Sequence, residues 1–284
     1  MNAHLAAEPA GDPDAVFRNF QRHNLGRAAE HFDLTITGTP LFGWRLRSIS
    51  APVTGRGSDC WLRVVSEEPR WARGDGWTGN ADANDLDDIP KPRMLDSCEW
   101  AEGDWRIQRA EVLTRVAGEP CSATDVLRTV PSLSEGRWSE LRRSFDILST
   151  APATRTYADQ DRVTDRITAR FGTSVDTTVT QWATVHGDIH WSNLMRPALA
   201  IVDWELWGRG PAGVDAASLL CHSLPVSEVA DEVRSRFADV LDTPTGRVAQ
   251  LYVAARLLRR IDGGDYPDLA APLHRHTRTL LHTP

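Results

Sequence analysis

The pattern of apolar residues changes once along this 284-residue chain, near residues 112–118, and that change limits the folds open to it. Before it, apolar and β-branched segments at residues 45–49 and 60–65 flank a run of turn residues. Gly55 and Gly57 stand in that run, which predicts a hairpin with a glycine-containing tip. We expect a short helix over residues 14–30, a strand over residues 93–99, and a strand or a hinge over residues 112–116.

After Pro120 the periodicity becomes helical. Ser122, three residues before Asp125, resembles a helix start in which the serine caps backbone N–H groups. Apolar residues share one helical face in the stretches 138–148, 163–171, 229–240 and 251–261. Two short apolar pieces, residues 184–185 and 199–202, are expected to be strands that each end at an aspartate-containing loop. The pattern therefore predicts an α+β fold with a β-rich first part and a mostly helical second part.

The charge balance limits the partners of the chain. There are 39 acidic and 32 basic residues, which gives a net charge of −7. A dedicated nucleic-acid binder shows a basic footprint, so that class is not expected, whereas an acidic cleft suits a cationic small substrate. No signal peptide and no apolar run of membrane-spanning length is found. We therefore expect a cytoplasmic monomer or homodimer with neither nucleic acid nor membrane as a partner.

Three polar residues carry the strongest chemical signal. Asp188 follows a short apolar segment, Asn193 comes five residues later, and Asp203 ends the next apolar segment. A carboxylate in such a loop can accept a proton from a hydroxyl nucleophile or orient it. An amide oxygen and a second carboxylate are ligands that suit Mg²⁺. One Asp, one Asn and one further Asp form the set of groups that phosphoryl transfer uses.

The segment His186-Gly187-Asp188, with Asn193 after it and Asp203-Trp204-Glu205 beyond, resembles the aminoglycoside phosphotransferase family. The resemblance covers most of the chain and implies a bilobal, protein-kinase-like fold. In that fold a β-rich nucleotide-binding lobe, here residues 1–112, and a helical catalytic and substrate-binding lobe, here residues 113–284, hold ATP between them. The resemblance further implies the following roles: Asp188 as catalytic base, Asn193 and Asp203 as Mg²⁺ ligands, the backbone from Thr114 to Val116 at the adenine, and Asp215 as a buried brace of the catalytic loop.

The first lobe departs from the family pattern. The family has a lysine on its third strand that contacts phosphates, and here the corresponding segment offers Arg63. Arginine binds phosphate through its fork but is not a neutral replacement for lysine. Lys91, the single lysine of the chain, is the other possibility, and we favour Arg63. Asp82 and Asp85 are candidate acidic partners. Gly55 and Gly57 are either a phosphate-binding loop or the turn of the hairpin.

Several further residues are candidates on the substrate side. His186 is expected to support the catalytic loop through hydrogen bonds rather than to carry protons. His190 either lines the substrate site or packs inside the lobe. Glu205 has either a substrate or second-metal role or a plain surface role. Trp207, together with Trp191 and Trp204, flanks the motif and can wall a substrate pocket.

These observations predict an ATP- and Mg²⁺-dependent O-phosphotransferase. Its expected acceptor is a hydroxyl of a small cationic antibiotic, either an aminoglycoside or a basic cyclic peptide, whose phosphorylation confers resistance. Three alternatives stay open. The first is a kinase of a small metabolite such as choline, homoserine or a sugar. The second is a metal-dependent hydrolase that uses His186, Asp188 and His190. The third is a non-catalytic nucleotide-binding module.

Overall fold

A computed structural model describes residues 12–55 and 57–282 of the chain. Contacts divide the chain into two compact units. The first comprises residues 1–84 and 92–116, and the second comprises residues 85–91 and 117–284. The first is rich in strands and the second is mostly helical, which confirms the predicted α+β class.

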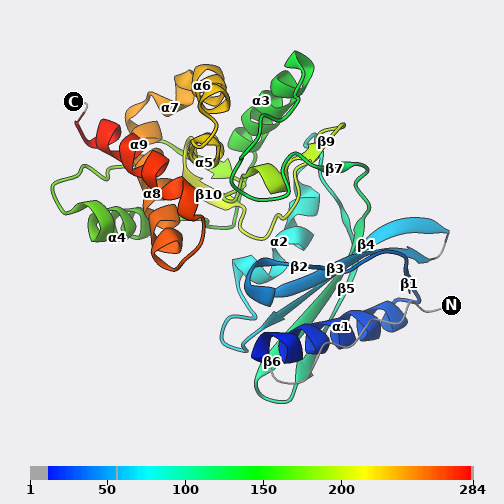
Figure 1. Cartoon of the computed structure of the whole chain (residues 1–284). Coiled ribbons are helices and arrows are strands. Elements are labelled where there is room, and N and C mark those ends of the chain that lie inside the picture. Colours follow the sequence, from blue (N-terminus) through cyan, green and yellow to red (C-terminus); the bar gives the residue numbers. More distant parts are fainter. Residues whose placement is uncertain (1–11, 56, 283–284) are drawn as a thin grey trace. The chain divides into compact units, whose positions relative to one another are not determined.

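The first unit is an antiparallel sheet that carries two helices (Figure 1). The strands run in the order β1-β3-β4-β6-β5, and β2 pairs with β3. The predicted hairpin is β3 and β4, whose last ladder pair is Gly55 with Ser58, and Gly57 at the tip has a φ of 81°, a conformation that glycine adopts readily. The bounds are α1 (Pro13–His31), β1 (Thr35–Ile36), β2 (Leu41–Phe42), β3 (Ser48–Gly55), β4 (Ser58–Glu67), α2 (Asp75–Asp82), β5 (Met94–Glu102) and β6 (Arg106–Thr114).

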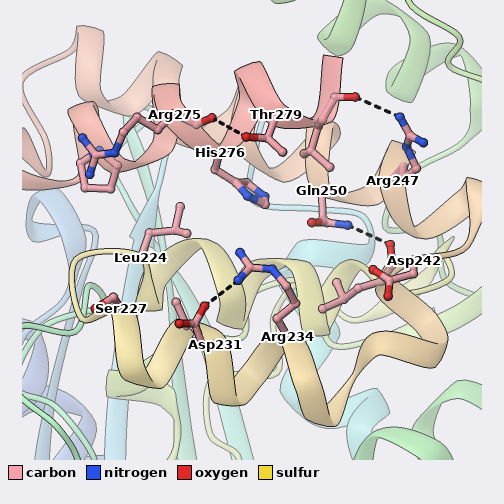
Figure 2. A pocket seen from close by; sticks show the side chains of 14 residues that line it. Leu224, Ser227, Asp231, Arg234, Asp242, Arg247, Gln250, Arg275, His276 and Thr279 are labelled. Carbon is pink, nitrogen blue, oxygen red and sulfur yellow. Dashed lines mark hydrogen bonds and ion pairs between the residues drawn. The ribbon is translucent and has the colours of Figure 1, made fainter. Parts of the chain in front are cut away.

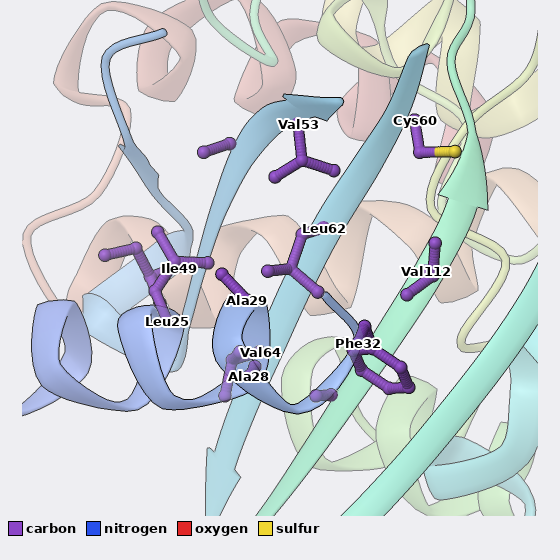
Figure 3. Close-up of a cluster of buried hydrophobic side chains, with 12 residues drawn as sticks. Leu25, Ala28, Ala29, Phe32, Ile49, Val53, Cys60, Leu62, Val64 and Val112 are labelled. Carbon is purple, nitrogen blue, oxygen red and sulfur yellow. The ribbon is translucent and has the colours of Figure 1, made fainter. Parts of the chain in front are cut away.

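The core of this unit lies between α1 and one face of the sheet (Figure 3). Leu25, Ala28, Ala29 and Phe32 recur at the spacing that places residues on one side of a helix. On the strands the buried residues alternate, because successive side chains of a strand point to opposite faces. The strand residues of the core are Ile49, Ala51, Val53, Cys60, Leu62, Val64, Ala110 and Val112.

The second unit consists mainly of helices around two small antiparallel sheets (Figure 1). β8 pairs with β10, and β7 pairs with β9. Helix α8 contacts α4, α5, α7 and α9, so it is the central helix of the unit. The bounds are β7 (Glu119–Pro120), α3 (Glu135–Thr150), α4 (Gln160–Phe171), β8 (Trp182–Val185), β9 (Met195–Arg196), β10 (Gly208–Pro211), α5 (Val214–Ser223), α6 (Ser227–Arg236), α7 (Ala238–Leu241), α8 (Pro244–Asp262) and α9 (Ala270–His282). No helix of the described residues is both long and apolar enough to cross a membrane.

Three expectations about this unit are wrong. Ser122 does not start a helix: its hydroxyl accepts from Thr124 N at 3.2 Å, and such local bonds compete with helix formation. The first helix after it begins at residue 135, with Ser134 as its cap. Residues 199–202 form only an isolated bridge between Leu194 and Ile201, because their backbone groups bond to several different segments. The stretch 229–240 spans two helices, α6 and α7, which are separated at Phe237.

Candidate active site

Strand β8 leads the chain into the segment 186–193, which holds the motif, and β10 pairs with β8. β8 ends at Val185, opposite Gly208 of β10. Gly187 follows with a φ of 81°, and a Cβ atom placed there would lie 2.5 Å from a ring carbon of Tyr157. Both the left-handed backbone and the close ring require glycine at this position. The chain turns here, and Asp188 is the next residue.

Asp215, the second residue of α5, is the anchor of this turn. Its carboxylate accepts hydrogen bonds from His186 N at 2.8 Å and from Gly187 N at 2.9 Å. Burial raises the pKa of Asp215 to about 6, although the two N–H donors act in the opposite direction. The geometry is therefore that of the brace that the family resemblance implies.

His186 joins the motif to the segment that follows it. Its Nδ1 atom accepts from Asp188 N at 3.3 Å, and its Nε2 atom lies 3.1 Å from the carbonyl oxygen of Val202, to which the Nε2–H tautomer donates. Burial lowers the pKa of His186 to about 4, so the ring stays neutral at pH 7. A neutral ring with both nitrogens engaged suits the predicted supporting role better than proton transfer.

Asp188 is held by a cation from α8. Arg256 Nη1 lies 3.2 Å from Asp188 Oδ1, and His190 Nε2 lies 3.6 Å from Oδ2. Burial alone raises the pKa of Asp188, but Arg256 and then His190 outweigh it, and the pKa lies below its ordinary value. Asp188 is therefore ionised at neutral pH. Its side chain keeps 22% of its surface exposed, so a ligand can reach the carboxylate.

His190 connects Asp188 to a second acidic residue. Its Nδ1 atom lies 2.9 Å from Ser192 Oγ, which donates to Asp125 Oδ1 at 2.9 Å. Burial lowers the pKa of His190, but the carboxylates of Asp188, Asp125 and Asp203 raise it above its ordinary value. Asp125 also accepts from the hydroxyl of Tyr266, a residue with a left-handed φ of 50°. His190 is thus part of a hydrogen-bonded chain and not an isolated packing residue.

Asn193 and Asp203 lie on two segments that are bonded to each other. Asn193 Nδ2 donates to the carbonyl oxygen of Asp188 at 3.0 Å, which leaves the amide oxygen as the atom of this side chain that suits a hard cation. Val202 N donates to the carbonyl oxygen of Asn193 at 3.0 Å, and Asp203 is the next residue. Asp203 is exposed and has a φ of 66°. An amide oxygen and a carboxylate on tied segments form a donor set that fits Mg²⁺.

The same geometry bears on the hydrolase alternative. Both ring nitrogens of His186 are engaged by the backbone, at Asp188 and Val202. Among residues 12–55 and 57–282, no three His, Cys, Asp or Glu side chains are arranged to hold a metal ion. The ligand set that a zinc or two-metal hydrolase needs is therefore not found in this part of the chain.

Glu205 and Trp207 stand close to Arg155. The guanidinium of Arg155 donates to the carbonyl oxygens of Glu205 at 2.9 Å and Trp207 at 3.0 Å, and it lies over the Trp207 ring at 5.1 Å. Only 4% of Trp207 is exposed, and Trp191 and Trp204 are buried as well. All three rings pack inside the unit, so the structure does not support the expectation that they form the wall of a substrate pocket. Glu205 is half-buried.

In the first unit, Arg63 lies on β4 directly opposite Glu111 of β6. Arg63 Nη1 is 3.2 Å from Glu111 Oε2, and the same oxygen accepts from Asn80 Nδ2 of α2 at 2.8 Å. Arg109 Nε donates to the other oxygen of Glu111 at 3.0 Å. Glu111 is thus a partner of Arg63 that the sequence pattern does not predict. The expected candidate Asp82 accepts from Thr78 at 2.7 Å.

The remaining predicted nucleotide contacts also lie in the first unit. Gly55 and Gly57 flank the tip of the β3–β4 hairpin, and Thr114 ends β6. Thr114 Oγ1 accepts from Arg93 N at 2.8 Å, and Val116 follows half-buried. Lys91 belongs to the second unit and donates to the carbonyl oxygen of Leu86. Arg63 and Lys91 therefore belong to different units, and the choice of Arg63 as phosphate ligand stays a prediction.

A pocket of about 580 Å³ lies elsewhere in the helical unit, among α6, α8 and α9 (Figure 2). None of the predicted site residues lines it. Arg234 and Arg247 face it, but Arg234 pairs with Asp231 at 2.8 Å, and Arg247 donates to the carbonyl oxygen of Leu280 at 3.0 Å. These two cations are therefore already engaged by protein groups.

Three solved structures resemble this chain. A thermostable mutant of aminoglycoside phosphotransferase APH(4)-Ia, in ternary complex with ADP and hygromycin B, is 16% identical, with a TM-score of 0.61 over 90% of this chain and 97% of that chain. Amicoumacin kinase hAmiN, in complex with AMP-PNP, Ca²⁺ and Ami, is 14% identical, with a TM-score of 0.57 over 95% and 96%. A putative fructosamine-3-kinase from Haemophilus somnus is 9% identical, with a TM-score of 0.50 over 94% and 100%. At these identities the likeness shows the fold, which is protein-kinase-like as predicted.

Comparison by sequence gives the family. No curated protein matches the chain. The sequence model of the phosphotransferase enzyme family (APH) matches residues 77–252, which is more than half of the chain. This match confirms the predicted family and, with it, the enzyme class of small-molecule phosphotransferase. The chain therefore belongs to the phosphotransferase enzyme family.

Proposed function

We propose that this phosphotransferase uses ATP and Mg²⁺ to phosphorylate a hydroxyl group of a small cationic antibiotic. The observation that carries the proposal is the geometry around Asp188. Its ionised carboxylate is fixed between Arg256 and His190, and the neighbouring segments present Asn193 and Asp203. An ionised, oriented carboxylate can accept a hydrogen bond from the acceptor hydroxyl and align its oxygen for attack.

The transfer itself forms one bond and breaks another. The acceptor oxygen bonds to the γ-phosphorus of ATP, the bond from that phosphorus to the bridging oxygen breaks, and ADP leaves. The hydroxyl proton passes to Asp188 and then to solvent. Asn193 and Asp203 would hold Mg²⁺, whose charge would offset that of the phosphate groups. Because the pKa of Asp188 is depressed, orientation of the hydroxyl contributes more than strong base strength.

Arg63 is the proposed phosphate ligand in the first unit. Its partner Glu111 is 2% exposed and receives hydrogen bonds from Asn80 and Arg109. The carboxylate that Arg63 contacts is therefore held in place, and it orients the arginine. A guanidinium can bind two phosphate oxygens through its fork. The hairpin tip at Gly55 and Gly57 and the backbone from Thr114 to Val116 are proposed to contact the phosphates and the adenine, respectively.

The choice of a cationic acceptor rests on the net charge of −7 and on the family. Two of the resembling structures are named for an aminoglycoside phosphotransferase and an amicoumacin kinase. One observation favours a second candidate, a kinase of a small metabolite such as choline, homoserine or a sugar, because the surroundings of the loop are not purely acidic. Arg256 pairs with Asp188, and Arg260 Nη2 lies 3.9 Å from Asp125 Oδ2, so two cations share the surroundings of the loop with the acids.

An intact-mass screen tests this proposal. Native protein with Mg-ATP is incubated with aminoglycosides, basic cyclic peptides, choline, homoserine and neutral sugars, and each compound is examined for one added phosphate. We expect a product in the cationic antibiotic group. Asp188→Asn should lower the rate by a factor on the order of 100 or more, while binding of Mg-AMP-PNP stays close to native.

Expression in a susceptible bacterium provides the biological readout. The native chain should raise the inhibitory concentration of the compound that is phosphorylated, and Asp188→Asn should not. A product only in the metabolite group would support the second candidate. A full rate in Asp188→Asn would overturn the proposal. Nucleotide binding without any phosphorylated product would also overturn it and would favour a non-catalytic module.

A further inference from the structure

One buried cation of the second unit contacts the motif at two consecutive residues. Arg256 Nη1 donates to the carbonyl oxygen of Gly187 at 2.9 Å and lies 3.2 Å from Asp188 Oδ1. Its Nη2 atom lies 3.3 Å from the hydroxyl of Ser218 in α5. The guanidinium therefore joins helix α8, helix α5 and the motif segment at a single point.

The two oxygens of Asp188 are held differently. Oδ1 faces Arg256, and Oδ2 faces His190 at the longer separation of 3.6 Å. A carboxylate without Arg256 could rotate about its side-chain torsions, whereas a charged partner at one oxygen restricts that rotation. The bond from Arg256 to the carbonyl oxygen of Gly187 also limits movement of the backbone that carries Asp188. Oδ2, whose contact with His190 is the longer of the two, is then the oxygen better placed to receive an acceptor hydroxyl.

Arg256 stands on a closely packed part of helix α8. The residue lies on the face of α8 that is buried against the rest of the unit, four residues after the fully buried Tyr252. Its own side chain keeps only 16% of its surface exposed. A charge in such a position is costly unless it is paired, and here a carboxylate, a carbonyl and a hydroxyl are its partners. These three partners compensate the charge of Arg256, and they match the several N–H donors of a guanidinium.

We infer that Arg256 is a positioning residue that fixes the Asp188 carboxylate for the acceptor hydroxyl, so that its loss lowers kcat without weakening nucleotide binding. The inference rests on the proposed function, because it assigns to Asp188 the role of receiving that hydroxyl. It extends the site from the motif segment to a residue of helix α8 that lies 69 positions after Gly187 in the sequence.

The test compares Arg256→Gln, Arg256→Lys and Arg259→Gln, with Mg-ATP as donor and water as acceptor. Arg259 is the matched control, since it is exposed on the same helix. ADP formation and the KM for ATP are measured below the melting temperature of each variant. We expect kcat of Arg256→Gln to fall by roughly 10- to 100-fold at an unchanged KM. Arg256→Lys should recover part of the loss, and Arg259→Gln should remain native.

A double-variant cycle separates this inference from the proposed function. If Arg256 acts through Asp188, Asp188→Asn with Arg256→Gln should be no slower than Asp188→Asn alone. Multiplied losses, or a full rate in Arg256→Gln, would overturn the inference while the proposed function stands. An undiminished rate in Asp188→Asn would overturn the proposed function and the inference with it. Hydrogen exchange of amides 186–193 gives a readout without turnover, and faster exchange is expected in Arg256→Gln than in Arg259→Gln.

Discussion

At the scale of single residues, buried charges are held by partners far away in the sequence. Glu111 is the clearest case, because its carboxylate is 2% exposed and receives Arg63 from β4 and Asn80 from α2, in addition to Arg109 two residues away on its own strand. A buried carboxylate with several charged or polar donors is fixed in place, and so are its donors. Arg63 therefore presents a cation whose position is set by the sheet itself.

Replacement of Arg63 tests its proposed contact with phosphate. Arg63→Met removes the charge and should raise the KM for Mg-ATP about tenfold or more, since a charge-assisted contact is lost. Arg63→Lys keeps the charge without the fork and should fall between Met and the native residue. Arg70→Met, at an exposed arginine that pairs with Glu68, is the control. A native KM in Arg63→Met would remove Arg63 from the nucleotide site.

Whether a site residue could be predicted depends on how far away in the sequence its partners lie. Asp188, Asn193 and Asp203 could be predicted because they fall within one short segment, where strand ends and loop spacing are visible. Arg256, Tyr266 and Glu111 could not, because their partnership depends on strand register and helix packing. One signal was present for Arg256: a charge on an otherwise apolar helix face indicates a buried partner.

At the scale of elements, prediction succeeded where caps and periodicity agreed. Helix α1 was expected over residues 14–30 and is found at Pro13–His31, with Asp12 accepting from Asp14 N as its cap. The helix start predicted at Ser122 is wrong because no helical periodicity follows the serine directly. Its hydroxyl instead forms a local hydrogen bond with Thr124 N. Periodicity also cannot show the break at Phe237, since both α6 and α7 continue the apolar stripe.

The contribution of α1 to the first unit can be measured with a matched pair of substitutions. Leu25 is completely buried against the sheet, whereas Val16 on the same helix is 62% exposed. Leu25→Ala should lower the free energy of unfolding by about 2–5 kcal/mol, because it removes buried methyl groups and leaves a cavity. Val16→Ala should change it by less than about 0.5 kcal/mol. Equal effects in urea denaturation would contradict the observed packing of α1.

At the scale of the whole molecule, the division into units is not a single cut in the sequence. Residues 85–91 belong to the helical unit although they lie between α2 and β5 of the first. Ile201 N donates to the carbonyl oxygen of Pro90 at 2.8 Å, which ties this short segment to the region beside Asp203. Periodicity could locate the change near residues 112–118. It could not show that residues 85–91 join the helical unit, because long-range bonds such as that from Ile201 to Pro90 leave no pattern in the sequence.

The helical unit also holds several histidines whose burial couples stability to pH. Burial lowers the pKa of His186 and His276 to about 4 and that of His222 to about 3. Each therefore contributes stability that is present above the unfolded pKa of about 6.5 and is lost as pH falls toward the folded pKa. Asp215, whose pKa burial raises to about 6, acts in the opposite direction. His190, whose pKa is raised, contributes stability that is lost as pH rises through its folded pKa.

Between pH 6.5 and 5 the three histidines with lowered pKa outnumber the two groups with raised pKa, Asp215 and His190, so the unfolded chain binds more protons and the free energy of unfolding should fall on acidification. His276→Asn removes one of these groups. It should reduce the pH slope by up to about 1.4 kcal/mol per pH unit, measured by denaturation at pH 7, 6 and 5. His274→Asn, at an exposed position of the same helix, is the control. A slope unchanged in His276→Asn would show that this ring binds protons equally in the folded and the unfolded chain, which would contradict its lowered pKa.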